Sequence, residues 1–179
     1  MRGLASIALC LALVACAADA PLQSDWEREQ QMQSWRESPV VLPPYPKKEN
    51  LVEFEVGAGP DFHFLVDASS LSVGSDGVVR YVLVARSPQG VENDSFEGLR
   101  CKDGEYKIYA TGRSDRTWSK ARDPRWRPVE QSPGSWHRTL ANDYFCPQGA
   151  PIRSVAEGVD ALRRGGNPKA SEVRLDPGS

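Results

Sequence analysis

Between residues 51 and 112 the chain is a succession of short segments in which apolar and polar residues alternate. In LVEFEVG (51–57) and DFHFLVD (61–67), alternate residues are apolar, which is typical of a half-buried β-strand. In VVRYVLVAR (78–86) both faces carry apolar residues, which predicts a central strand. Short strands joined by turns favour an antiparallel sheet.

The segment SFEGLRCKDGEYKIYATG (95–112) predicts a β-hairpin. Its Asp103-Gly104 pair is the strongest short-range signal for one, because both central residues of a type I′ turn need a positive φ. Residues 95–101 and 105–111 are then the outgoing and returning strands. Four or five antiparallel strands are therefore expected before residue 112.

Helical patterns follow a loop. Residues 113–135 contain prolines and two tryptophans, which predicts a long loop packed onto the sheet. A short helix is expected from Ser135, with Trp136, Leu140 and Tyr144 on one face. A second helix is expected at about 152–164, where Ser154 and Glu157 form a capping-box pattern and Gly165-Gly166 ends the periodicity. No internal repeat is visible.

The first twenty residues, MRGLASIALCLALVACAADA, predict export. The apolar run 4–15 is too short to span about 30 Å of hydrocarbon as a helix, but it suits a signal peptide. Residues 13–16, Leu-Val-Ala-Cys, resemble the lipobox of bacterial lipoproteins, which implies cleavage before Cys16 and acylation of its thiol and amine. Cleavage after Ala20 is the alternative, but it leaves Pro21 at the first mature position. Cys10 is a weaker lipidation candidate.

Several acyl chains on one residue anchor a protein stably to a membrane. Ala17, rather than Asp, follows Cys16, and by the same resemblance this favours the outer membrane, facing the periplasm with surface exposure left open. The predicted organisation is a signal peptide (1–15), a lipid-anchored Gln- and Pro-rich tether (16–49), one α+β domain (50–164) and a disordered tail (165–179).

Two cysteines remain once Cys10 and Cys16 are assigned to the leader and the lipid. In an oxidising periplasm, Cys101 and Cys146 are most simply one disulfide. A free reactive thiol is the alternative, and it would need a neighbouring base. The predicted fold class is therefore α+β, an antiparallel sheet of about five or six strands packed against one or two C-terminal helices, with one disulfide.

Four motifs occur in order along the chain: SDGVVRY, EGLRC, YATG and YFCP. Together, and within a stretch from about Leu42 to Gly149, they resemble the CNP1-like family, small secreted proteins of Gram-negative bacteria. The resemblance implies an envelope location and supplies no mechanism. The layout is also distantly similar to the surface-adhesin E type of lipoprotein domain, which implies fold more than function.

Charge argues against nucleic acid as a partner. The chain has 22 Lys and Arg against 24 Asp and Glu, a net charge of −2 and a pI of about 5.8. Nucleic-acid-binding domains usually have a basic stripe and a high pI.

Glu97 is the candidate buried charge, because it shares a strand face with Leu99 and Cys101. A carboxylate near a buried face must be paired or hydrogen-bonded. A cross-strand ion pair with Arg80 is the preferred interpretation, and Arg100 is the other possible partner. A ligand-binding charge and general acid/base catalysis remain alternatives.

The aromatic residues leave two readings open. In the preferred interpretation, four aromatic residues line the core: Trp118, Trp126, Trp136 and Tyr109. In the alternative interpretation, the same residues form a surface platform for a partner or glycan. His63 shares a strand face with Asp61 and Asp67, but residues two apart on one strand rarely converge on a metal.

No catalytic, metal or cofactor site is predicted, since G-x-S-x-G, H-E-x-x-H and C-x-x-C are absent. The expected function is that of a non-enzymatic outer-membrane lipoprotein that contacts a protein partner in the envelope. Arg80, Glu97, Arg100, Trp118 and Trp126 are the candidate contacts. A surface-displayed adhesin is the alternative. An enzyme would gain ground only if a pocket brought Glu97, Arg80 and a histidine together.

Overall fold

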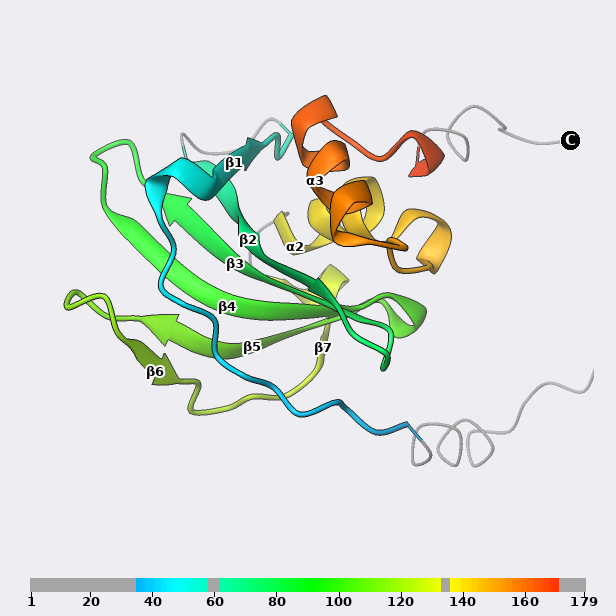
Figure 1. Ribbon diagram of the computed structural model, residues 1–179, viewed down its shortest axis with the longest axis horizontal. Coiled ribbons are helices and arrows are strands. Elements are labelled where there is room, and N and C mark those ends of the chain that lie inside the picture. Colours follow the sequence, from blue (N-terminus) through cyan, green and yellow to red (C-terminus); the bar gives the residue numbers. More distant parts are fainter. Residues whose placement is uncertain (1–34, 58–61, 133–135, 171–179) are drawn as a thin grey trace, which may run out of the picture. The chain divides into compact units, whose positions relative to one another are not determined.

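The computed structural model describes residues 35–57, 62–132 and 136–170 (Figure 1). The predicted signal peptide, the lipidation site Cys16 and the tether up to residue 34 lie outside the described residues, as does the tail beyond residue 170. The folded unit begins at Glu37. No helix in the described part of the chain is long and apolar enough to cross a membrane.

The described residues form a seven-stranded antiparallel sheet in the order β1-β2-β3-β4-β5-β6, with β7 also paired to β5. The strands are β1 (Leu51–Phe54), β2 (His63–Val73), β3 (Val78–Arg86), β4 (Glu92–Arg100), β5 (Glu105–Gly112), β6 (Trp118–Lys120) and β7 (Arg127–Pro128). β3 lies between β2 and β4 and is buried on both faces over Val78–Val84, as the two-sided apolar pattern predicts.

The hairpin between β4 and β5 is confirmed, but its turn is not type I′. Asp103 keeps a negative φ, and the chain makes a 3₁₀ turn, η2 (Cys101–Asp103), before Gly104 takes the left-handed conformation at φ +62°. The prediction of the turn type was therefore wrong. Glycine is needed only at this last position, because it alone has a positive φ.

The C-terminal part of the chain is helical. Its elements are α2 (Trp136–Thr139), the π-helical η4 (Leu140–Phe145) and α3 (Val155–Arg164), with 3₁₀ turns η3 (Val129–Gln131) and η5 (Pro147–Gly149). A further 3₁₀ turn, η1 (Lys48–Asn50), directly precedes β1. The predicted cap Ser135 lies outside the described residues. The bond from the Cys146 N–H to the Ala141 carbonyl, 2.8 Å long, spans five residues and gives η4 its π-type turn.

Ser154 caps α3 as predicted, but Glu157 accepts from the N–H of Arg153 rather than from that of Ser154, so only one half of the capping box forms. The Ser154 side chain accepts from the Glu157 N–H at 3.2 Å, and the Glu157 carboxylate accepts from the Arg153 N–H at 2.9 Å. Gly165 ends the helix in the left-handed conformation. The disordered tail was predicted to begin at residue 165, which is too early. Asn167 is buried, and its N–H donates to the Asp143 carbonyl at 2.7 Å.

The main core lies between the helices and one face of the sheet, here called the inner face. α3 packs against β1 and β2 (Figure 1). The disulfide between Cys101 and Cys146 joins the end of β4 to the end of η4. The α+β fold and the disulfide are therefore confirmed. Aromatic rings fill this core: Phe54 meets Tyr144 edge-on at 5.5 Å, and Tyr81 meets Phe145 at 5.4 Å.

The opposite, outer face of the sheet is covered by residues 37–46, here called the strap (Figure 1). Val40 and Leu42 pack on a second apolar cluster, and the Pro43 carbonyl accepts from the Trp118 indole N–H at 2.9 Å. The outer cluster consists of Leu65, Val82, Val84, Phe96 and Ala110. The prediction that this proline-rich stretch is a spacer was therefore wrong for residues 37–46. Its apolar residues bury the second face of β3.

Candidate functional site

The helices cover only part of the inner face (Figure 1). A cavity of about 670 Å³ opens over the end of the sheet where β2 and β4 begin and β3 and β5 end. Its apolar walls are Phe62, Phe64, Leu83, Ala85, Ile108 and Trp136. Its polar lining includes Glu92, Asp94, Ser95, Glu97, Thr111, Arg113 and His137. A mainly apolar hollow of this size with a few polar groups is typical of a small-molecule site.

Glu97 lies at the wall of this cavity with only 2% of its surface exposed. Its carboxylate accepts hydrogen bonds from the Tyr81 hydroxyl at 3.1 Å and the Ser95 hydroxyl at 2.6 Å, and it lies 2.9 Å from Nε2 of His137. Burial by itself would raise the pKa of this carboxyl. The charge of His137 and the three hydrogen bonds outweigh burial and lower the pKa below its usual value.

The His137 ring has contacts on its face and at both of its nitrogens. Its ring stacks on the Tyr106 ring with centroids 3.9 Å apart, and Nδ1 lies 2.6 Å from the Ser132 hydroxyl. Both ring nitrogens are therefore engaged, one by Glu97 and the other by Ser132. The imidazole thus provides a hydrogen-bond partner for the buried carboxylate of Glu97.

The series Ser132, His137, Glu97 has the residue types of a hydrolytic triad. The three side chains do not all face the cavity, because Glu97 and His137 line its wall while Ser132 does not. A nucleophile must reach a bound substrate, but the Ser132 hydroxyl contacts Nδ1 of His137 and is not part of the cavity lining. Glu97 and His137 therefore form a hydrogen-bonded part of the cavity wall.

The predicted pair between Glu97 and Arg80 is wrong. Glu97 faces Tyr81 across the β3–β4 ladder, and Arg80 faces Gly98, so the two side chains point to opposite faces of the sheet. Arg80 instead forms an ion pair with Asp76 at 2.6 Å. The sequence favoured an enzyme only if Glu97, Arg80 and a histidine shared a pocket. Glu97 and His137 line the cavity, but Arg80 lies on the opposite face of the sheet.

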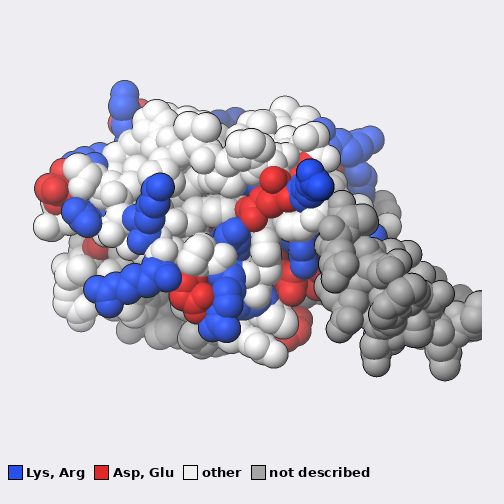
Figure 2. All heavy atoms as spheres, turned by 90° about the horizontal axis from the view of Figure 1, so that it is seen from below, with Lys and Arg blue, Asp and Glu red and all other residues white. Residues whose placement is uncertain are grey.

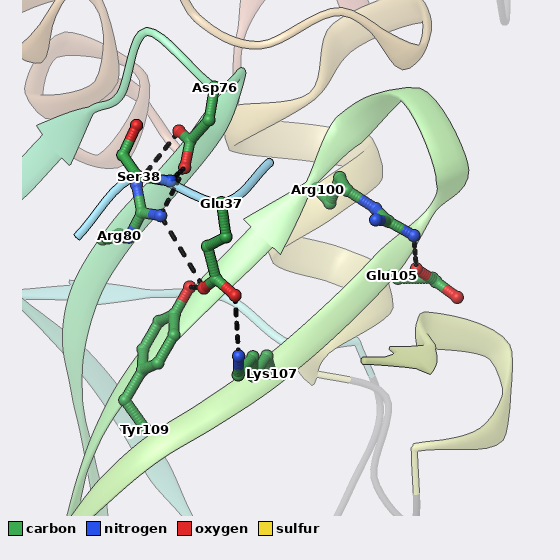
Figure 3. A network of polar contacts seen from close by, with 8 residues as sticks. All are labelled: Glu37, Ser38, Asp76, Arg80, Arg100, Glu105, Lys107 and Tyr109. Atoms are coloured by element: carbon green, nitrogen blue, oxygen red, sulfur yellow. Dashed lines mark hydrogen bonds and ion pairs between the residues drawn. The ribbon is translucent and has the colours of Figure 1, made fainter. Parts of the chain in front are cut away.

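Arg80 belongs to a separate polar cluster on the outer face (Figure 3). Glu37, at the start of the strap, lies 2.7 Å from both the Lys107 ammonium and the Tyr109 hydroxyl, and 3.8 Å from Arg80. Burial by itself would raise the pKa of Glu37, but these donors lower it. Together they fix one end of the strap to β3 and β5.

The remaining predicted contact residues all have partners within the domain. Arg100 pairs with Glu105 and Asp103, and its guanidinium lies 5.2 Å from the Trp126 ring centroid. Trp118 packs under the strap, 5.0 Å from the Tyr45 ring centroid. Neither tryptophan meets Glu97.

His63 is paired with Glu53 across the β1–β2 ladder. Within the described part of the chain, no group of three or more His, Cys, Asp or Glu side chains could hold a metal. The residues that sequence reasoning missed are His137, Tyr81, Ser95, Glu37 and Asp76. The contact of His137 with Glu97 and those of Glu37 with β5 span 40 to 72 residues, and no local pattern signals them.

Comparison with known proteins supports the resemblance. Residues 30–163 match the CNP1-like family. The chain belongs to this family. It is also similar to Cryptic neisserial protein 1 of Neisseria gonorrhoeae, with 24% identity over 153 residues that cover 74% of this chain and 75% of that protein. No solved structure shows significant similarity, so the likeness of layout to surface-adhesin E type domains stays a prediction. The family match spans both the strap and the cavity.

Proposed function

We propose that this chain is a non-enzymatic binding protein of the bacterial envelope that holds a small, largely apolar molecule in the cavity of its inner face. The observation that carries the proposal is that cavity of about 670 Å³, with its mainly apolar walls. Pockets in this size range bury most of the surface of a small ligand. Chemistry is disfavoured because Glu97 and His137, the two buried ionisable groups of the wall, are engaged with each other.

Cavity occupancy tests this directly. Ala85→Phe places a ring in the cavity, while Ala150→Phe adds the same ring at an exposed turn. The protein is purified from its own membranes in mild detergent, and bound molecules are detected by native mass spectrometry. We expect a bound species in the wild type and in Ala150→Phe, and none in Ala85→Phe. Equal retention by Ala85→Phe would rule the cavity out.

The finer part of the proposal is lipid anchoring at Cys16 in the outer membrane. It rests on the apolar run 4–15 followed by Leu-Val-Ala-Cys. Cys16→Ser should abolish incorporation of labelled palmitate and release the protein from the outer-membrane fraction. Cys10→Ser, in the same leader, should change neither. Protease shaving of intact cells distinguishes periplasmic from surface display, because only a surface-displayed protein is cut.

A protein partner is the second candidate, and one observation favours it. Phe62, at the mouth of the cavity, is 40% exposed and stacks on Phe64 with centroids 6.3 Å apart. Exposed aromatic residues beside a hollow are typical of contact hot spots. Crosslinking in live cells from Phe62 should then yield one reproducible adduct, and exposed Val91 is the matched control position. A surface-displayed adhesin remains the alternative partner-binding role.

A further inference from the structure

The most basic segment of the chain surrounds a second hollow. RSDRTWSKARDPRWR, residues 113–127, carries six Arg and Lys against two Asp, in a chain whose net charge is −2. It forms β6 and the loop to β7 at the edge of the sheet. Seen from below, Lys and Arg side chains are spread over this side of the molecule, with fewer Asp and Glu between them (Figure 2).

The second hollow has a volume of about 380 Å³. Its charged lining is Lys120, Arg122, Asp123, Arg125 and Arg127, and hydroxyls of Tyr106, Thr111 and Ser119 complete it. Oδ2 of Asp123 lies 2.8 Å from Arg125 and 2.9 Å from Arg127, so one carboxylate is shared by two guanidinium groups. Within the described residues, Lys120 and Arg122 form no ion pair. The lining is therefore net positive and rich in hydrogen-bond donors, which suits a phosphate or carboxylate.

The two hollows meet on β5. Ile108 and Thr111 line both the apolar cavity and the basic hollow. The two hollows are therefore adjacent along β5. Most of the basic side chains of this segment line the second hollow, whereas the ionisable groups in the wall of the apolar cavity are mainly acidic. The cavity by itself therefore does not explain why Lys and Arg gather beside it.

We infer that the cavity and the basic hollow form one site for an amphipathic anion, a molecule with an apolar body and a phosphate or carboxylate group. The apolar body lies against Phe64, Leu83 and Trp136, and the anionic group lies among Lys120, Arg122 and Arg127. This inference rests on the proposed function and adds the chemical class of the ligand. Arginine and lysine attract such a group before contact, and salt screens that attraction.

The test uses calorimetric titration of the chain exported to the periplasm with Cys16→Ser, so that no detergent competes. The probes are decyl phosphate, decanoate, decanol and decyltrimethylammonium, each below its critical micelle concentration. We expect the two anions to bind most tightly, decanol more weakly and the ammonium most weakly. Raising the salt concentration should weaken the anions and leave decanol nearly unchanged.

Variants locate the anionic subsite. Lys120→Gln with Arg122→Gln should weaken the binding affinity for decyl phosphate about tenfold, because each exposed charge contributes up to about fivefold to the affinity. The same variant should leave decanol unchanged. The control, Arg163→Gln with Arg164→Gln, removes two exposed charges from α3 and should change neither ligand more than about twofold.

The outcomes separate the two claims. If decanol binds as tightly as decyl phosphate and the Lys120/Arg122 variant has no effect, the anionic subsite is wrong and the cavity function stands. If both double variants weaken decyl phosphate equally, the effect is one of overall charge, and the subsite is again wrong. If no probe binds, the inference and the proposed function fail together.

Discussion

The carboxylate of Glu97 lies 2.9 Å from Nε2 of His137, 40 residues later in the chain, and both side chains are 97–98% buried. Removing one member of such a pair leaves an uncompensated buried charge, which costs about 3–5 kcal/mol. His137→Phe keeps a ring on Tyr106 but removes the partner of Glu97. We expect it to lower the free energy of unfolding by about that amount in urea denaturation.

The matched control removes both members. Glu97→Leu combined with His137→Phe should recover most of the lost stability, because an apolar pair of similar volume is often neutral relative to a buried ion pair. A His137→Phe variant as stable as the wild type would show that Glu97 does not depend on the imidazole.

The second prediction concerns pH and Asp76. Burial by itself would raise the pKa of Asp76, but Arg80 and the backbone N–H groups of Ser38 and Val78 lower it from 3.8 to about 2. A carboxyl whose pKa is lower in the folded state stabilises above its unfolded pKa, and this stability is lost as the pH falls through the folded value. The contribution of Asp76 should therefore be complete above pH 3.8 and disappear towards about pH 2.

Urea denaturation at a series of pH values measures this effect. Asp76→Asn should unfold more easily than the wild type at neutral pH, and the difference should shrink below pH 3.8. Asp160→Asn, at an exposed position of α3, is the control and should keep the wild-type dependence. A constant difference at all pH values would contradict the assignment.

The third prediction compares two adjacent valines of the strap. Val40 packs against the outer apolar cluster, while Val41 is 84% exposed. Val40→Ala should lower the free energy of unfolding by about 1 kcal/mol, because it removes partly buried methyl groups that pack against this cluster. Val41→Ala should change it by less than about 0.5 kcal/mol. Equal effects would mean that the strap does not pack as described.

The fourth prediction concerns the disulfide between Cys101 and Cys146, which are 45 residues apart in the chain. Closing a loop of that length restricts the unfolded chain and contributes about 4 kcal/mol in the chain-entropy model. A reductant should lower the free energy of unfolding of the wild type accordingly. The Cys101→Ala, Cys146→Ala double variant should be less stable and indifferent to reductant. An unchanged wild type in reductant would contradict the prediction.

Local patterns in the sequence predicted much of the fold. The two-sided apolar pattern of residues 78–86 placed β3 at the centre of the sheet, and Ser154 and Glu157 placed the start of α3. These signals are local, because strand alternation and helix caps involve residues within a few positions of one another. The disulfide was also predictable, since only two cysteines remained to pair.

The candidate site was not predictable in the same way. Glu97 was recognised as a buried charge, but its partner was assigned to Arg80 because the arginine lies on a neighbouring strand. A shift of one residue along a ladder moves a side chain to the opposite face. That shift decides whether Glu97 meets Arg80 or Tyr81, and only the register of β3 against β4 fixes it.

By itself, the sequence determined the α+β class, the central strand, the last helix and the pairing of the two cysteines, because each depends on short-range periodicity or on counting. The tertiary structure alone decided that residues 37–46 cover the outer face and that His137 satisfies Glu97. It also decided that the inner face keeps an open cavity beside a basic hollow. Those features depend on which faces meet across 40 to 72 residues, and alternation within a strand does not contain that information.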